Sequence, residues 1–260
     1  MDHARPYRRG ESPLNADPAA QLRLLDLQAH DLKLDQLAHR RRTLPEIAEL
    51  ETLAAEHSRL KDAEVATTTE VTDLEREQKR ADADVEQVRR RKERDQQRLD
   101  AGQVSAAREL ERLQSEIGSL NRRQADLEDA ELEIMEKLED AQQRLAALAA
   151  ERERVGRHAL GVQQARDAAR AEIDADVERI QQERAAVAAE IPADLLTLYE
   201  KVRATSDGIG AAALRKRRCE GCHLELDPMS LAGIRSTAAD EVIRCEECRR
   251  ILVRTPESGL

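Results

Sequence analysis

The sequence predicts a mainly α-helical protein, in which a long antiparallel coiled-coil hairpin is followed by a small C-terminal β zinc ribbon. Three observations lead to this fold class. The 260-residue chain has no Phe, no Trp and two Tyr, although large aromatic side chains usually supply much of a globular core. Its charged fraction of 37% is high, yet 40% of its residues are hydrophobic, which argues against simple disorder. All four cysteines lie in the last 42 residues, as two Cys-x-x-Cys pairs.

Residues 1–17 are expected to be a disordered tail, because they are polar and their charges cancel. This stretch lacks the apolar region of a signal peptide, and no window of the chain approaches 18 consecutive apolar residues. We therefore expect a cytoplasmic protein that does not enter a membrane. In that compartment the cysteines would be reduced thiols or metal ligands rather than disulfides.

Residues 18–190 are predicted to form the hairpin, because apolar residues recur at alternating steps of three and four. From Leu110 to Val187, 17 of 23 such positions are apolar, and from Leu53 to Leu99 the pattern holds at 8 of 14. A 3.5-residue period predicts the seam of a left-handed coiled coil. A polar turn near 100–105, which contains Gly102, separates two legs of similar length, so the legs should pair antiparallel.

A bend is predicted near 43–45 on the first leg and 156–161 on the second. Thr43-Leu44-Pro45-Glu46 has the residues of a helix start, with Thr43 as N-cap and Glu46 completing a capping box. An antiparallel pairing places Gly156 and Gly161 near this point on the other leg. Helix breakers on both legs favour a bend or hinge, although one proline and two glycines could also coincide by chance.

Three segments follow the hairpin. Residues 191–207 should contain a short connecting helix, about 193–206, that buries several leucines and Tyr199. Residues 208–254 are predicted to form the zinc ribbon, with strands near 211–218, 241–243 and 251–254, and residues 255–260 a tail. Gly208-Ile209-Gly210 is interpreted as a linker, because no strand precedes it and no phosphate-loop lysine follows.

The two Cys-x-x-Cys pairs predict one structural Zn²⁺ held by four thiolates. The candidate ligands are Cys219, Cys222, Cys245 and Cys248, with 22 residues between the pairs. Iron in a rubredoxin-like site uses the same spacing but usually has an aromatic core beside it, and a redox dithiol needs a βαβ unit. His223, next to Cys222, is more consistent with a turn residue than with a ligand. Four thiolates leave no open coordination position, so catalysis at the metal is not expected.

The order of these parts resembles a bacterial family of C4-type zinc ribbon, coiled-coil proteins that is catalogued as a domain of unknown function. The matching stretches are Leu24–Gln28, Leu110–Ile117, Leu127–Asp129, Leu198–Arg203 and Cys245–Leu252. Relatives often have Gly where this chain has Arg249 and an aromatic where it has Val253; neither change threatens metal binding. The resemblance implies a cytoplasmic, non-enzymatic adaptor with nucleic-acid or protein partners, and no single shared activity.

Two basic clusters stand out in a chain of net charge −10. The ribbon cluster comprises Arg215, Lys216, Arg217, Arg218, Arg244, Arg249 and Arg250. The hairpin-tip cluster comprises Arg89, Arg90, Arg91, Lys92, Arg94 and Arg98. Either cluster could contact nucleic acid or an acidic partner, and either could instead be a solvated face. Without Phe or Trp, base stacking is nearly unavailable, so sequence-specific reading of single strands is not expected.

The predicted function is therefore a non-enzymatic, regulatory zinc-binding adaptor that binds RNA or DNA, a protein, or both. One alternative is an RNA-polymerase-associated factor that inserts its hairpin into the secondary channel, but such factors present acidic tips. Another is an architectural spacer. No nucleophile motif, phosphate loop or small-molecule site is evident, and the pattern does not decide between monomer and dimer.

Overall fold

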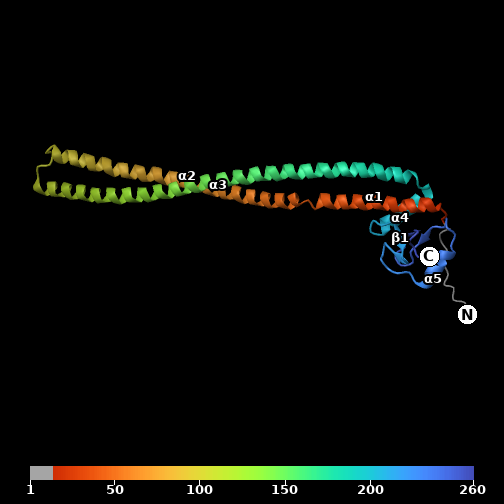
Figure 1. The fold of residues 1–260 in the computed structure, drawn as a ribbon. Coiled ribbons are helices and arrows are strands. Elements are labelled where there is room, and N and C mark those ends of the chain that lie inside the picture. The colour runs from red at the N-terminus through yellow and green to blue at the C-terminus, as the bar shows by residue number, and fades with distance from the viewer. Residues whose placement is uncertain (1–13) are drawn as a thin grey trace. The chain divides into compact units, whose positions relative to one another are not determined.

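The computed structural model describes residues 14–260, and it confirms the predicted fold class (Figure 1). Helices α1 and α2 form one leg of a long hairpin against α3, and a small β zinc ribbon follows. The helices are α1 (Pro18–Arg42), α2 (Pro45–Asp100), α3 (Ala107–Ala189), α4 (Ala193–Thr205) and α5 (Pro228–Ser236). The strands are β1 (Ala211–Arg215), β2 (Arg218–Cys219), β3 (Ile243–Arg244) and β4 (Ile251–Arg254).

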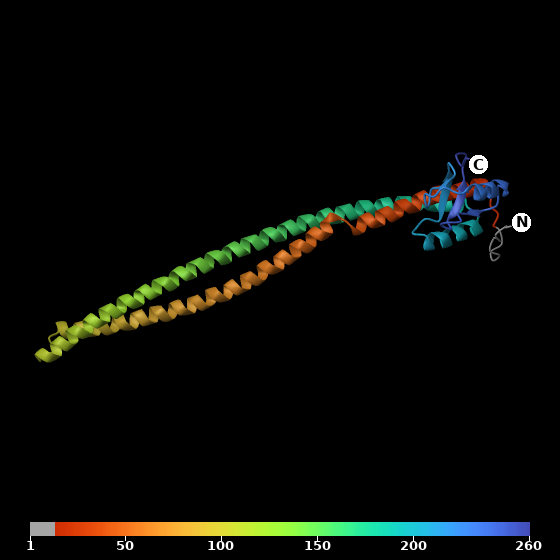
Figure 2. The same cartoon turned by 90° about the horizontal axis from the view of Figure 1, so that it is seen from below.

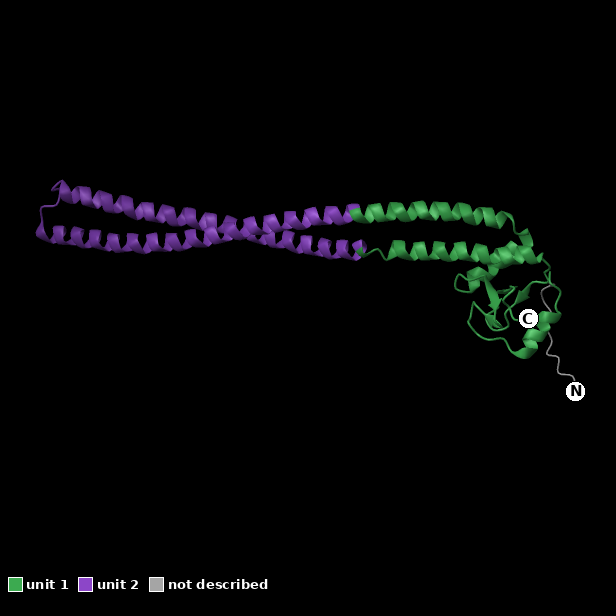
Figure 3. Ribbon diagram, in the orientation of Figure 1, with its two compact units in different colours: residues 1–45, 165–260 green, residues 46–164 purple. Residues whose placement is uncertain are grey.

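The described residues form two compact units (Figure 3). One contains the described chain up to Pro45 together with Ala165–Leu260, and the other is Glu46–Gln164. The predicted boundaries at 191 and 208 therefore do not separate independent cores, because the ribbon, α4 and α1 belong to the same unit.

The second unit is a coiled coil of α2 and the first part of α3, which lie side by side in two perpendicular views (Figures 1 and 2). Its buried seam side chains are Leu53, Leu60, Thr67, Val71 and Val85 from α2, and Leu113, Leu138, Ala141, Val155 and Val162 from α3. Each of them occupies a position of the predicted heptad pattern. The connecting turn covers 101–106, and Gly102 has a φ of +65°, which glycine adopts without steric penalty.

The helix break at residues 43–44 interrupts one leg only. The Thr43 hydroxyl donates to the His39 carbonyl at 3.0 Å, so Thr43 ends α1 instead of serving as the predicted N-cap of α2. On the other leg α3 continues through Gly156 and Gly161. A glycine inside a helix costs about 1 kcal/mol but keeps its N–H, whereas proline removes a helical hydrogen bond. A hinge at this level stays a prediction.

The first unit has a core that joins the hairpin base to the ribbon. Leu24 and Leu27 of α1 and Leu195 and Tyr199 of α4 are completely buried in one cluster. From the ribbon, Ala211, Val242, Ile251 and Val253 enter the same cluster. The ribbon therefore obtains apolar burial from α1 and α4 that its own short strands could not supply.

The ribbon sheet has the order β2-β1-β4-β3, with β1 and β4 parallel and the outer pairs antiparallel. Between the two cysteine pairs lies α5, a helix that was not predicted. Asp227 caps it, since its Oδ1 accepts from the backbone N–H groups of Met229 at 2.8 Å and Ser230 at 3.0 Å. Asp227 followed by Pro228 is a recognisable helix start that strand-based reasoning overlooked.

Described residues of both predicted tails are folded. Residues 1–13 of the N-terminal one lie outside the described residues, but Ala16 N–H donates to the Asp240 carbonyl at 2.7 Å and Val242 N–H to the Leu14 carbonyl at 2.9 Å. At the other end, Ser258 is 3% exposed, and Lys216 N–H donates to the Glu257 carbonyl at 2.7 Å. Residues 14–17 and 255–258 are thus folded parts of the ribbon, because they satisfy main-chain groups that its short strands leave unpaired. No helix within residues 14–260 has the length and apolarity to cross a membrane.

Candidate metal centre

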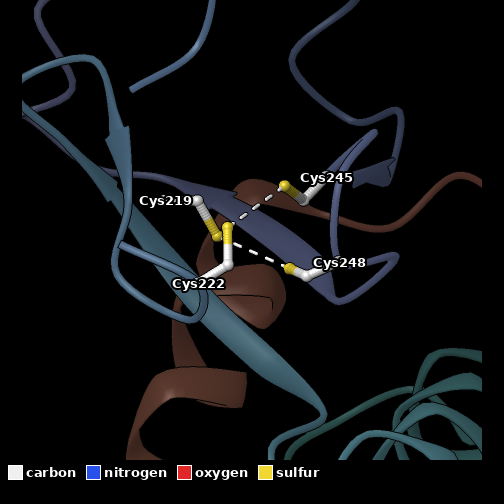
Figure 4. Close-up of side chains that lie close together, drawn as sticks. All are labelled: Cys219, Cys222, Cys245 and Cys248. Atoms are coloured by element: carbon white, nitrogen blue, oxygen red, sulfur yellow. Dashed lines mark hydrogen bonds between the residues drawn. The ribbon is translucent and has the colours of Figure 1, made fainter. Parts of the chain in front are cut away.

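The four cysteine sulfurs meet in one cluster (Figure 4). Cys219 ends β2 and Cys222 follows it, whereas Cys245 and Cys248 lie between β3 and β4. All four Sγ atoms are within 4.8 Å of one another, and the Cys219–Cys248 and Cys222–Cys245 Sγ distances are both 3.9 Å. Four thiolates about 2.3 Å from a tetrahedral metal ion would be about 3.8 Å apart. The four-cysteine site is consistent with one structural Zn²⁺.

The surroundings of the sulfurs suit a bound cation. Burial raises the pKa of the Cys219 and Cys245 thiols. Backbone N–H groups that hydrogen-bond to their sulfurs lower the pKa, but the effect of burial is larger. At Cys248 burial also opposes ionisation, but hydrogen bonds, first from the Arg250 backbone, bring the pKa below its ordinary value. Thiolates in such a site need a positive charge for compensation, and a divalent ion with soft-ligand affinity supplies it.

The two cysteine pairs have the same turn geometry. His223 and Arg249, each next to the second cysteine of its pair, have φ values of +61° and +63°. Their backbone N–H groups donate to the Cys219 carbonyl at 2.7 Å and the Cys245 carbonyl at 2.9 Å. His223 is thus a turn residue, and the cluster found among residues 14–260 contains cysteines alone. Glycine adopts this left-handed conformation without steric penalty, which fits the glycine that the resemblance leads us to expect where this chain has Arg249.

Arg249→Gly is expected to stabilise the ribbon by about 1 kcal/mol, because a non-glycine residue pays roughly that much in the left-handed region. The measurement is the midpoint of denaturant unfolding, with zinc content determined in parallel. Arg235→Ala, which removes a cation from the exposed side of α5, is the control and should leave the midpoint unchanged. A lower midpoint for the glycine variant would contradict the strain argument.

Arg250 is half-buried and belongs to the framework of the ribbon. Its guanidinium donates to the Gly221 carbonyl at 2.8 Å and to the Ser206 carbonyl at 3.0 Å. It therefore ties the first cysteine turn to the end of α4. These two hydrogen bonds give Arg250 a structural role in the ribbon, and its predicted contact with a partner stays a prediction.

The remaining ribbon cations lie at the surface with different degrees of pairing. Arg215 to Arg218 are all exposed and lie on the hairpin formed by β1 and β2. Arg215 Nε is 3.2 Å from Glu257 and Arg217 Nε is 3.8 Å from Glu225. Arg218 donates to the His223 carbonyl at 2.7 Å, and Arg244 to the Arg249 carbonyl at 2.8 Å. Within residues 14–260, the Lys216 and Arg249 side chains make no hydrogen bond or ion pair.

Most cations of the hairpin-tip cluster have an acidic partner on their own coiled coil, and one donates to a neutral amide. Arg89 and Arg90 pair with Glu86, and Arg89 also lies 3.6 Å from Glu128. Across the seam, Arg91 pairs with Glu116 and Lys92 donates to Gln124 at 2.6 Å. Arg98 is 3.8 Å from Asp95, and Arg94 is exposed without a partner among the described residues. Glu86, Glu116 and Glu128 lie outside the stretch 89–98 that holds the cluster, so the sequence of that stretch alone does not reveal these partners.

A buried polar network at the base of the hairpin was not predicted. Asp31 of α1 is 1% exposed. Its carboxylate accepts from Tyr199 Oη at 2.6 Å and from Arg184 Nε at 2.6 Å, and Arg203 Nε lies 3.4 Å away. The network thus connects α1, α3 and α4. The sequence contained one indication of this network, because Asp31 is a polar residue on the same helix face as the apolar Leu24 and Leu27.

Gln28, one turn before Asp31, holds the linker to the ribbon. Its Oε1 accepts from Gly210 N–H at 2.6 Å, and its Nε2 donates to the Gly208 carbonyl at 3.0 Å. At Gly210 a Cβ atom would lie 2.7 Å from the Tyr199 ring, so the glycine is required by close packing. The Gly-x-Gly sequence is therefore a packed linker, as interpreted, and not a phosphate-binding loop.

Comparisons with known proteins match both parts of the chain. A family model for the CT398-like coiled coil hairpin domain matches residues 27–207, and one for the C4-type zinc ribbon domain matches residues 218–252. An uncharacterized protein of Mycobacterium tuberculosis is 37% identical over 241 residues, which cover 93% of this chain and 98% of that protein. An uncharacterized protein of Mycobacterium leprae is 30% identical over 217 residues, covering 84% and 93%.

Solved structures agree with these matches. A protein from Mycobacterium smegmatis aligns with a TM-score of 0.78 at 33% identity, over 93% of this chain and 100% of that one. CT398 from Chlamydia trachomatis aligns with a TM-score of 0.66 at 18% identity, over 91% and 98%; that likeness concerns the fold.

Proposed function

Because the chain belongs to the family of proteins with a CT398-like coiled-coil hairpin and a C4-type zinc ribbon, we propose that it is a non-enzymatic adaptor of the cytoplasm whose ribbon binds nucleic acid. The observation that carries the proposal is the run of four exposed cations, Arg215 to Arg218, on the hairpin of β1 and β2. A strand hairpin fixes such side chains in a defined arrangement, which suits a regular row of phosphates.

The charge distribution supports the ribbon as the contact surface. Residues 208–260 carry nine basic and eight acidic side chains, whereas the whole chain has a net charge of −10. A polyanion is therefore repelled by the molecule as a whole and attracted only where cations cluster. At the hairpin tip most cations already have acidic partners, so that cluster is the weaker candidate.

The metal has a structural part in this proposal. Four cysteines fill the coordination sphere of a zinc ion, which leaves no position for a substrate or an activated water molecule. Zinc would keep β2 and the cysteine turns in place, and the protein surface around them would make the contacts. An adaptor of this kind needs no small-molecule substrate, and the hairpin offers a second surface for a protein partner.

The proposal predicts that replacing Arg215, Lys216, Arg217 and Arg218 together with glutamine lowers nucleic-acid affinity at least tenfold at low salt. The physical reason is the loss of phosphate contacts, each of which contributes about 0.7 to 0.9 to the slope of log affinity against log salt. Affinity is measured by fluorescence anisotropy with labelled single-stranded RNA, double-stranded RNA and double-stranded DNA across a salt series.

The matched control makes the same charge change at the hairpin tip, with Arg89, Arg90, Arg94 and Arg98 replaced by glutamine. It should retain most of the affinity and the salt slope. Equal losses in both variants would indicate a nonspecific charge effect, and no binding of any probe by the wild-type protein would refute the proposal. Binding of an acidic protein through the same four residues, without nucleic-acid binding, would also refute it.

A further inference from the structure

The turn between β1 and β2 has an unfavourable amino-acid sequence for its conformation. Arg215 pairs with Arg218, so Lys216 and Arg217 form a two-residue turn, with φ values of 45° and 66°. Two successive positive φ values define a type I′ turn, for which Asn-Gly is strongly preferred. Two long cationic side chains occupy these positions instead.

The C-terminal segment holds this turn in place. Lys216 N–H donates to the Glu257 carbonyl at 2.7 Å and Arg217 N–H to the Ser258 carbonyl at 2.9 Å. The segment is itself fixed, because Ser258 is 3% exposed and the Thr255 hydroxyl donates to the Leu214 carbonyl at 2.8 Å. A strained conformation persists when its surroundings determine it in this way. Because the backbone N–H groups of the turn already donate within the protein, a partner would contact the turn through the Lys216 and Arg217 side chains.

Both side chains are available. The Lys216 side chain is exposed and makes no hydrogen bond or ion pair within residues 14–260. Arg217 has one acidic neighbour at 3.8 Å, Glu225, and both of these side chains are about half or more exposed. Exposed ion pairs of this length contribute little, so Arg217 can exchange this partner for another anion.

We propose that Lys216 and Arg217 are the principal phosphate-binding residues of the ribbon, and that the braced turn preorganises them for phosphodiester oxygens. This inference rests on the proposed nucleic-acid function and names the residues that perform it. Arginine can bind two phosphate oxygens at once and lysine supplies a compact charge. If stability alone determined the residues of this turn, asparagine and glycine would be expected at these positions. Phosphate binding would explain why the turn has two cations instead.

The test separates backbone strain from side-chain charge. Lys216→Asn with Arg217→Gly introduces the favoured turn residues and should keep or raise the unfolding midpoint, retain one zinc per chain and lower nucleic-acid affinity about tenfold. The salt slope should fall by about 1.4 to 1.8, the contribution of two phosphate contacts. Lys216→Gln with Arg217→Gln should lower affinity equally without any gain in stability. The control pair Lys61→Gln with Arg235→Gln removes two exposed cations elsewhere and should bind like the wild type.

The outcomes discriminate between this inference and the function on which it rests. If the wild type binds RNA or DNA and the Asn-Gly variant binds equally well, the inference is overturned and the proposed function survives. If the Asn-Gly variant loses zinc or stability, the strain argument fails. If the wild type binds no probe, both the inference and the proposed nucleic-acid function are refuted. A preference among the three probes would identify which phosphodiester backbone is recognised.

Discussion

Replacing Cys219 with serine is expected to abolish stoichiometric zinc binding and unfold the ribbon while most of the helical signal remains. Cys219 is completely buried in a small cluster with Leu214, Ile234 and Leu252. In small zinc domains, metal binding contributes about 10 to 16 kcal/mol of apparent free energy. A serine would leave one coordination position without a thiolate, so much of that free energy is lost.

Three measurements on Cys219→Ser check this result: zinc content by elemental analysis, far-ultraviolet circular dichroism and hydrogen exchange. Exchange should accelerate in residues 211–254 and also in α4, whose Tyr199 and Val202 share a core with the ribbon strands. Residues 46–164 should keep their protection, because they form a separate compact unit. His223→Asn is the matched control, since asparagine tolerates a positive φ, and it should retain zinc. Zinc at full occupancy in the serine variant would show that the assignment of the four ligands is wrong.

The second large effect is expected for Asp31→Ala, which should destabilise the first unit by about 3 to 5 kcal/mol. The carboxylate of Asp31 is buried and accepts hydrogen bonds from the Tyr199 hydroxyl and from the guanidinium of the partly exposed Arg184. Without Asp31, the Arg184 guanidinium would be paired, among the described residues, only with Glu200, whose side chain is 44% exposed. Losing the buried partner of an ion pair is strongly destabilising, because the remaining charge is then poorly compensated. The free energy of unfolding is obtained from urea titration followed by circular dichroism and by hydrogen exchange in α1 and α4.

Asp35→Ala is the control for the Asp31 experiment. Asp35 also pairs with Arg203, at 2.9 Å, but its side chain is 50% exposed, and exposed pairs contribute about 0 to 1 kcal/mol. Tyr199→Phe, which removes only the hydroxyl, should fall between the two variants at about 1 to 3 kcal/mol. Similar effects for Asp31→Ala and Asp35→Ala would contradict the importance of burial in this network.

The coiled-coil seam and the cysteine cluster could be predicted because both depend on spacing along the chain. The buried residues of α2 and α3, such as Leu60 and Val155, follow from a 3.5-residue period that any long antiparallel pair must satisfy. The four cysteines follow from a ligand spacing that tetrahedral coordination requires. Strand β4 was predicted at its observed bounds, 251–254, because a short apolar run directly after a cysteine turn favours a strand over other structures.

Features that depend on distant contacts could not be predicted. Asp31 and Arg184 are 153 residues apart, and nothing in the local sequence of either predicts the other. The pairing of Arg89 with Glu128 and of Arg91 with Glu116 becomes apparent only with the register of the two legs. Likewise, the left-handed turns at Lys216, Arg217 and Arg249 contradict local residue preferences, which is why sequence reasoning found the cations but not their conformation.

Because Tyr199 is buried, its phenol absorption can report on the opening of the surrounding core. The chain has no tryptophan, and its two tyrosines are Tyr7 and Tyr199, so the phenol absorption and emission come from these two residues without interference from an indole. Burial, followed by the hydrogen bond to Asp31, raises the pKa of the Tyr199 phenol far above its ordinary value. Its ionisation at alkaline pH therefore records when solvent reaches the junction of α1, α4 and the ribbon, and no chemical label is needed to observe that junction opening.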